Sequence, residues 1–259
     1  MYQSFYTGAL GAGTCMAKMS VISNNIANIN NDGFKPKNVA FTDLLQFNLN
    51  DSETAVTELQ SGNGVRLQRT YASYNTGAFT TTNNLLDYAI LEDNQFFRVQ
   101  DPATGDITYT RNGHFHRGEL ASGEGFYLLT DNGKLVLDQN GEPMRAEVPE
   151  FSDEEDEEDY EVEDEEEEED EDAPRITLCT FTHPSRLLSV GDNEYVPPAG
   201  MEPILLRNAK METGVLERSG TDLAKEMVHM IECQRAYSYA LRMVTTSDEV
   251  ESTINSLRG

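Results

Sequence analysis

Residues 222–258, DLAKEMVHMIECQRAYSYALRMVTTSDEVESTINSLR, carry the pattern that decides the fold. Apolar residues recur there at alternating steps of four and three, the spacing of a helix that packs along one seam. The seam slips after Val244 and resumes at Val250. Thr221 or Ser219 can cap the start of this helix. The sequence therefore predicts one long C-terminal helix whose stripe comprises Leu223, Met227, Met230, Gln234, Tyr237, Leu241 and Val244.

Residues 1–29, MYQSFYTGALGAGTCMAKMSVISNNIANI, show the same spacing at the other end of the chain. Gly8, Gly11 and Gly13 weaken this helix by roughly 1 kcal/mol each relative to alanine, so packing partners have to supply stability. The turn formers at 30–33 predict where the helix ends. The predicted stripe comprises Tyr2, Phe5, Ala9, Ala12, Met16, Met19, Ser23 and Ile26.

The middle of the chain favours strands and turns instead. Residues 41–80 look irregular except for a short strand near Val65, whereas residues 85–148 alternate apolar and polar side chains between turn signals. Asn112-Gly113 predicts a hairpin turn, and so do the Asn-Gly steps at 132–133 and 140–141. We predict an α+β fold in which both chain ends form an α-helical coiled-coil domain and a mostly antiparallel β domain is inserted. The predicted segments are 1–40 (N-terminal helix and its end), 41–80 (extended linker), 81–213 (β domain with a disordered acidic loop at 152–173) and 214–259 (C-terminal helix).

Composition narrows the function. The net charge of −27 is concentrated in residues 153–172, which hold 18 acidic side chains; the rest of the chain has 28 acidic and 19 basic residues. No basic patch points to nucleic acid, and no stretch of 18 apolar residues predicts a membrane span. The three cysteines are far apart and show neither metal spacing nor a disulfide framework. No cofactor, metal or catalytic constellation is expected, nor a cleavable secretion signal.

Three sets of residues resemble the flagellar basal-body rod and hook protein family. They are SNNIANINNDGFKPKNVAFTDLL at 23–45, GAFTTTNNLLDYAILEDNQFFRV at 77–99 with YTRNGHFHRGEL at 109–120, and GVLERSGTDLAKEMVHMIECQRAYSYALRMVTTSDEV at 214–250. They occur in the family's order, and the length is most similar to a distal-rod subunit. The acidic run departs from the family pattern, where more β structure is usual.

The resemblance implies a structural, non-enzymatic subunit of the flagellar basal body. It implies export by the flagellar type III apparatus without a cleaved signal, and polymerisation with itself and other rod or hook subunits into a hollow shaft that transmits torque for motility. The terminal helices would form the inner tube and the β domain the outer layer. Under this reading the assembly interface comprises Tyr2, Phe5, Met16, Met19, Asn24, Asn25, Ile26, Asn28, Leu223, Met227, Met230, Gln234, Arg235, Tyr237, Leu241 and Val244.

Several alternatives stay open on the sequence. The heptad stripes can pack within one chain as well as between subunits. Asn24, Asn25 and Asn28 can cap a helix end instead of binding a neighbour, and Arg235 can be a solvated residue instead of pairing with an acidic group of a neighbour. At the level of function, the alternatives are a hook subunit or hook-associated component, and an acidic module that binds cations or a basic protein.

Overall fold

The computed structural model describes residues 2–44, 46–48, 60–119, 125–146, 176–206 and 209–258. The chain divides into two units: residues 1–78 with 218–259, and residues 79–217. The first unit therefore joins the two ends of the chain, and the second is inserted between them. The acidic tract at 153–172 lies outside the described residues.

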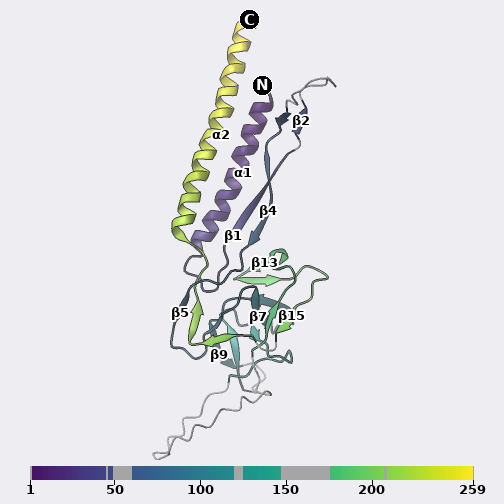
Figure 1. The fold of residues 1–259 in the computed structure, drawn as a ribbon, viewed down its shortest axis with the longest axis vertical. Helices are drawn as coiled ribbons and strands as arrows, with labels where there is room; N and C mark the ends of the chain where they lie inside the picture. Colours follow the sequence, from purple (N-terminus) through teal and green to yellow (C-terminus); the bar gives the residue numbers. More distant parts are fainter. Residues whose placement is uncertain are drawn as a thin grey trace, which may run out of the picture. The chain divides into compact units, whose positions relative to one another are not determined.

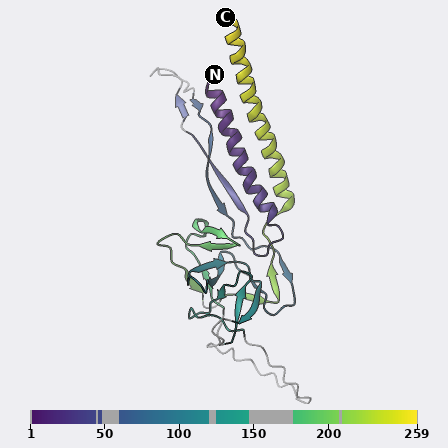
Figure 2. The same cartoon turned by 180° about the vertical axis from the view of Figure 1, so that it is seen from behind.

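The first unit is built on two helices that lie antiparallel and side by side in both views (Figures 1 and 2). The shorter helix has 26 residues and the longer one 36, which correspond to lengths of about 39 and 54 Å. Residues 41–80, expected as an extended linker, contribute an antiparallel ribbon in which β1 pairs with β4 from Lys37↔Ala72 to Asp43↔Val65. The elements of this unit are α1 (Tyr2–Ala27), β1 (Lys37–Asp43), β2 (Gln46–Asn48), β3 (Gln60–Gly62), β4 (Val65–Ala72) and α2 (Leu223–Arg258).

The second unit is a β domain in which every strand pair is antiparallel. Its main sheet has the order β13-β14-β8-β7-β11-β10-β9, with β12 pairing both β7 and β15. The elements are β5 (Phe79–Thr81), β6 (Tyr88–Ile90), β7 (Gln95–Gln100), β8 (Ile107–Thr110), β9 (Phe115–Glu119), β10 (Phe126–Thr130), β11 (Leu135–Val136), β12 (Leu178–Thr180), η1 (Pro184–Arg186), β13 (Leu188–Gly191), β14 (Glu194–Val196), β15 (Ile204–Leu206), β16 (Met211–Thr213) and β17 (Val215–Glu217). The α+β class with a helix at each end and mostly antiparallel sheets is confirmed.

The core of the β domain collects the apolar side chains of β7 and its neighbours. Phe97 and Val99 of β7 are fully buried, and Phe115 stacks edge-on against Phe97 with ring centroids 5.2 Å apart. Val136 of β11 and Leu178 of β12 complete this centre, and both of these strands pair with β7. Burial of such side chains contributes roughly 1.5–3 kcal/mol each relative to exposure.

One predicted turn is wrong. Asn112-Gly113 does not close a hairpin, because β8 pairs with β7 and β14 whereas β9 pairs with β10. A glycine is needed here because two backbone segments approach each other closely. The Gly113 carbonyl accepts a hydrogen bond from Tyr88 N at 3.0 Å, and a Cβ on Gly113 would lie 1.7 Å from the Tyr88 carbonyl oxygen. The hairpin turns predicted at Gly133 and Gly141 are confirmed, with positive φ at both glycines.

Candidate assembly surface on the terminal helices

The interior of the α1–α2 pair is lined by small residues. A Cβ on Gly8 would lie 3.0 Å from Cγ2 of Val244 and 3.2 Å from the carbonyl oxygen of Ala240, and one on Gly11 would lie 3.8 Å from Cβ of Ala240. The hydroxyls of Ser4 and Ser247 hydrogen-bond at 3.1 Å. The glycines that weaken α1 as an isolated helix therefore permit the two helix backbones to approach closely.

Asn25 joins three segments of the first unit. Its side chain is 1% exposed; its amide donates to the Lys37 carbonyl at 2.9 Å and to Glu226 Oε1 at 3.1 Å, and its Oδ1 accepts from Lys37 N at 2.9 Å. The residue thereby ties the end of α1 to the start of β1 and the start of α2. These hydrogen bonds lie within one chain.

Asn24 and Asn28 lie at the C-terminal end of α1. Asn28 donates its amide to the Asn24 carbonyl at 2.8 Å and accepts from the Asn31 amide at 2.7 Å. Side chains of this kind satisfy carbonyl groups that the last helical turn leaves without intrahelical partners.

The cap of α2 differs from the predicted one. Asp222, directly before the first helical residue, accepts hydrogen bonds from the backbone N–H groups of Ala224 (3.0 Å) and Lys225 (3.2 Å). Ser219 instead accepts from Thr221 N at 3.3 Å, in the turn that leads to the helix. A carboxylate at this position also interacts favourably with the helix dipole.

The structure divides the predicted stripe residues into two groups. The interior of the pair is formed by positions such as Gly8, Ile22 and Cys233. Each of these lies one residue before a predicted stripe position. One edge of each stripe is therefore covered by the other helix, and the opposite edge is open. Of the predicted set, Asn25 is buried and the half-buried residues are Met19, Ile26, Asn28, Met230, Tyr237 and Val244. The exposed residues are Phe5, Met16, Asn24, Leu223, Met227, Gln234, Arg235 and Leu241. The side chain of Tyr2 lies outside the part of the chain that the structure describes.

The open edge is strongly apolar. Met16 is 62% exposed and Met227 53% exposed, and Val228, Ile231 and Met243 add further exposed side chains on α2. Beyond Ser247, which contacts the first turn of α1, the last three turns of α2 carry Val250, Ile254 and Leu257, all exposed. Exposed large apolar side chains in this number make the helix pair a candidate interaction site.

A groove continues this surface beside α1. It has a volume of about 390 Å³ and runs between one face of α1 and the start of β4. Gly64, at φ +106°, brings the chain close enough that a Cβ would lie 3.2 Å from Cγ2 of Thr7. The groove is lined by Tyr6, Ala9, Leu10, Gly13, Thr14, Ala17, Val65, Arg66 and Leu67.

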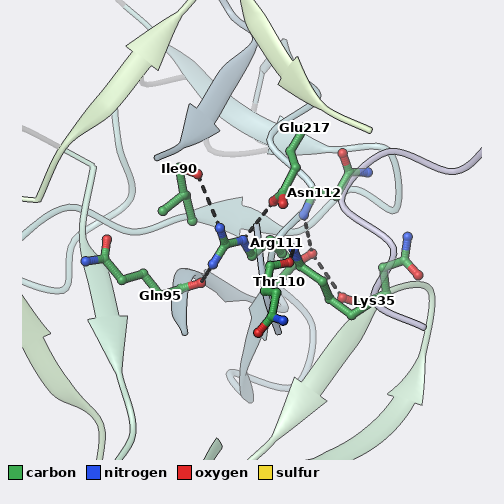
Figure 3. Close-up of polar contacts among 9 residues, drawn as sticks. Lys35, Ile90, Gln95, Thr110, Arg111, Asn112 and Glu217 are labelled. Carbon is green, nitrogen blue, oxygen red and sulfur yellow. Dashed lines mark hydrogen bonds and ion pairs between the residues drawn. The ribbon is translucent and has the colours of Figure 1, made fainter. Parts of the chain in front are cut away.

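The polar centre of the β domain, shown in Figure 3, was not predicted from the sequence. The Arg111 side chain is fully buried; its Nε donates to Glu217 Oε2 at 2.8 Å, Nη1 to the Gln95 carbonyl at 3.1 Å and Nη2 to the Ile90 carbonyl at 3.2 Å. This one side chain thus connects β6, β7 and β17. Buried cations need such partners, because an unpaired buried charge is strongly destabilising.

Other titratable groups of the β domain have structural partners. His114 Nδ1 lies 2.8 Å from Asp87 Oδ1, and Asp87 also accepts from Thr82 and Asn84. Burial raises the pKa of Cys179 to about 12.

Within the described residues, no group of three or more potential ligands could hold a metal ion, and neither helix is long and apolar enough to cross a membrane.

Comparison with known proteins agrees with this architecture. Residues 5–35, which hold most of α1, match the family described as flagella basal body rod protein, and residues 212–257, which hold most of α2, match the flagellar basal body rod FlgEFG protein C-terminal family. The chain belongs to the flagellar basal-body rod protein family and is a structural subunit of the bacterial flagellar basal body.

Within that family the chain is similar to distal-rod proteins along its whole length. It is 30% identical to the flagellar basal-body rod protein FlgG of Bacillus subtilis, with all of both chains covered. It is 29% identical to FlgG of Buchnera aphidicola subsp. Baizongia pistaciae (99% of this chain, 100% of the relative). It is 27% identical to FlgG of Borreliella burgdorferi (100% of this chain, 99% of the relative).

Proposed function

We propose that the chain polymerises through α1 and α2 into the hollow, torque-transmitting shaft of the rod. The observation that carries this proposal is the open apolar edge of the helix pair. One edge of each stripe is used inside the chain, and the exposed edge, with residues such as Met16, Met227 and Leu241, is available to helices of neighbouring subunits.

The packing between subunits is a coiled coil under this proposal. The stripe residues keep the alternating three- and four-residue spacing that supercoiled helices need. The groove between α1 and β4 would hold the apolar overhang of a neighbour's α2, in which Val250, Ile254 and Leu257 are exposed. The partners are therefore copies of this chain and other rod subunits, and the role is structural rather than catalytic.

Export completes the proposal. A rod subunit has to leave the cytosol, and we propose that the flagellar export apparatus carries this chain without removal of a signal peptide. The segments proposed for the assembled molecule are the helical ends 1–40 and 214–259 with the intervening 41–80, and the β domain 81–213 as the outer layer.

The structure selects the variants that test assembly. Leu223→Asp and Met227→Asp place a charge on the open edge without touching the interior of the pair, because these side chains are 40% and 53% exposed. Arg242→Asp is the control, since Arg242 is exposed on the same helix and none of its neighbours three or four residues along the helix belongs to the predicted stripe. Each variant is expressed in a strain that lacks the native subunit, and purified hook–basal bodies are analysed by immunoblot and electron microscopy.

We expect Arg242→Asp to enter the rod and restore motility. We expect the two stripe variants to remain as secreted monomers, because burying an unpaired carboxylate in an apolar contact is unfavourable by several kcal/mol, on the order of magnitude known for buried charges. Normal incorporation of both stripe variants would refute the proposed interface.

A further inference from the structure

The two helices bring together two cysteines that are 218 residues apart in the sequence. Cys233 Sγ donates a hydrogen bond to the Cys15 carbonyl at 3.0 Å, which places the Cys233 side chain directly against the backbone of Cys15. Cys15 is half-buried on α1 and Cys233 is 3% exposed on α2. Both thiols are reduced in this structure.

The helix backbones approach each other closely near this pair. Gly11 lies one helical turn before Cys15, and a Cβ on it would lie 3.8 Å from Cβ of Ala240 on α2. A disulfide needs Cα atoms within about 4.4–6.8 Å of each other. Small residues such as Gly11 and Ala240 allow the two helices to approach closely along this stretch.

We propose that Cys15 and Cys233 form a redox latch, a disulfide that covalently joins α1 to α2 when the chain meets a disulfide-bearing oxidant. The pairing rests only on the helix pair. Its timing rests on the proposed export: the thiols stay reduced in the cytosol, where the chain must be free to unfold, and become oxidised outside it.

The reaction is a two-step thiol–disulfide exchange. The Cys15 thiol loses its proton and attacks the oxidant disulfide, which gives a mixed disulfide on Cys15 and releases one thiolate. Cys233 then loses its proton and attacks the sulfur of Cys15, which forms the internal disulfide and releases the second thiolate. The protein loses two electrons and two protons, and the oxidant becomes two thiols.

The solvent exposure of the two thiols determines which of them reacts first. Cys15 is the more accessible thiol and meets the oxidant first. Burial, and then the neighbouring Cys15, raise the pKa of Cys233, so its thiolate is scarce at neutral pH and the second step becomes faster as the pH rises. Cys179 is fully buried in the β domain and takes no part.

The test uses the purified full chain with oxidised glutathione, in native buffer and in concentrated urea. Free thiols are alkylated at each time point, and intact mass and peptide mapping follow. In native buffer we expect the loss of two hydrogens and a linked peptide pair that contains Cys15 and Cys233. The share of internal disulfide should exceed that in urea at least about tenfold, because the fold replaces a long flexible tether by direct contact.

Substitution of each cysteine in turn identifies which two sulfur atoms form the disulfide. Cys179→Ser should behave as the native chain does. Cys233→Ser should stop at one mixed disulfide on Cys15, whereas Cys15→Ser should react little because the thiol left on the helix pair is buried. A persistent glutathione adduct on Cys15 with Cys233 still reduced, or an equal share of internal disulfide in urea, would overturn the latch. Leu223→Asp and Met227→Asp should still form the disulfide, so loss of assembly and loss of the latch are separate results.

Discussion

Removal of the Glu217 carboxylate is the sharpest perturbation of the β domain that the structure offers. Glu217→Ala leaves the Arg111 guanidinium buried without the carboxylate that neutralises its charge, while its hydrogen bonds to the carbonyls of Gln95 and Ile90 remain. Both members of the ion pair are almost completely buried, with side-chain exposures of 0% and 2%. Water therefore cannot replace the lost partner without opening the contacts around β17.

The expected magnitude follows from that burial. Breaking a buried ion pair by removing one partner lowers the free energy of unfolding by about 3–5 kcal/mol. For a unit of this size that loss corresponds to a decrease in melting temperature of roughly 10–20 °C. Glu217→Gln keeps a hydrogen-bond acceptor and should lose less, and the double variant Arg111→Met/Glu217→Leu should recover most of the stability because no charge remains buried.

The assay is thermal unfolding followed by near-ultraviolet circular dichroism, in which the tyrosines report tertiary packing because the chain has no tryptophan. Glu212→Ala is the matched control: Glu212 is an exposed glutamate of the neighbouring strand β16, and its loss should change stability by no more than about 0.5 kcal/mol. A Glu217→Ala protein that melts within about 2 °C of the native chain would refute the claim that this pair is a necessary partner of the buried charge.

Two further predictions concern α1 and the buried thiol of the β domain. Gly8→Ala should destabilise the helix pair because the new methyl group would lie 3.0 Å from a side-chain atom of α2. Gly13→Ala, with nothing within 4 Å of the new methyl group, should stabilise α1 by roughly 1 kcal/mol. Thermal unfolding followed by circular dichroism at 222 nm distinguishes the two variants, and equal shifts in melting temperature would contradict the packing. The pKa of the Cys179 thiol is raised to about 12 from its ordinary value of 9.0, so the unfolded chain releases this proton at lower pH than the folded chain and stability should fall as the pH rises from 9 toward 12. Urea unfolding at stepwise pH should therefore show a shallower alkaline decline in Cys179→Ala than in the native chain, and identical slopes would contradict the prediction.

The elements of the fold were predictable where the signal was local. The periodicity of α2 and the glycine-containing turns at 133 and 141 depend on residues within a few positions of one another. The Asn112-Gly113 step was misread because the same dipeptide serves two purposes. A hairpin turn needs the conformational freedom of glycine. In this structure Gly113 is needed because it has no side chain, which permits backbone contact with Tyr88, 25 residues earlier and on another strand. Only tertiary structure separates these uses.

The candidate surface shows the same limit. Heptad spacing identified both stripes, yet it could not say which edge packs inside the chain, since that depends on how closely two helices approach. Gly8 and Gly11 permit a close approach of α1 to α2, so that small residues beside the predicted stripe, as well as stripe residues such as Ala12 and Val244, lie between the helices. The contact of Cys15 with Cys233 has no sequence signal, because it follows from the antiparallel register of helices at opposite ends of the chain.

The choice of small residues for the interior explains why assembly and helix order belong together. A pair whose interior contains small residues such as Gly8 and Ala12 beside the larger Ile22 gains less from the hydrophobic effect than one built on large side chains, because the effect contributes about 25 cal/mol per Å² of apolar surface removed from water. The large side chains, such as Met16, Met227 and Leu257, lie outside the pair and gain nothing until a neighbour covers them. Ordering two long helices is entropically unfavourable by about 1–2 kcal/mol per residue. We therefore expect the helix pair of a free subunit to be marginally stable and to become firmly ordered as neighbouring helices cover the open edge, so that ordering of the ends and growth of the shaft are one coupled step.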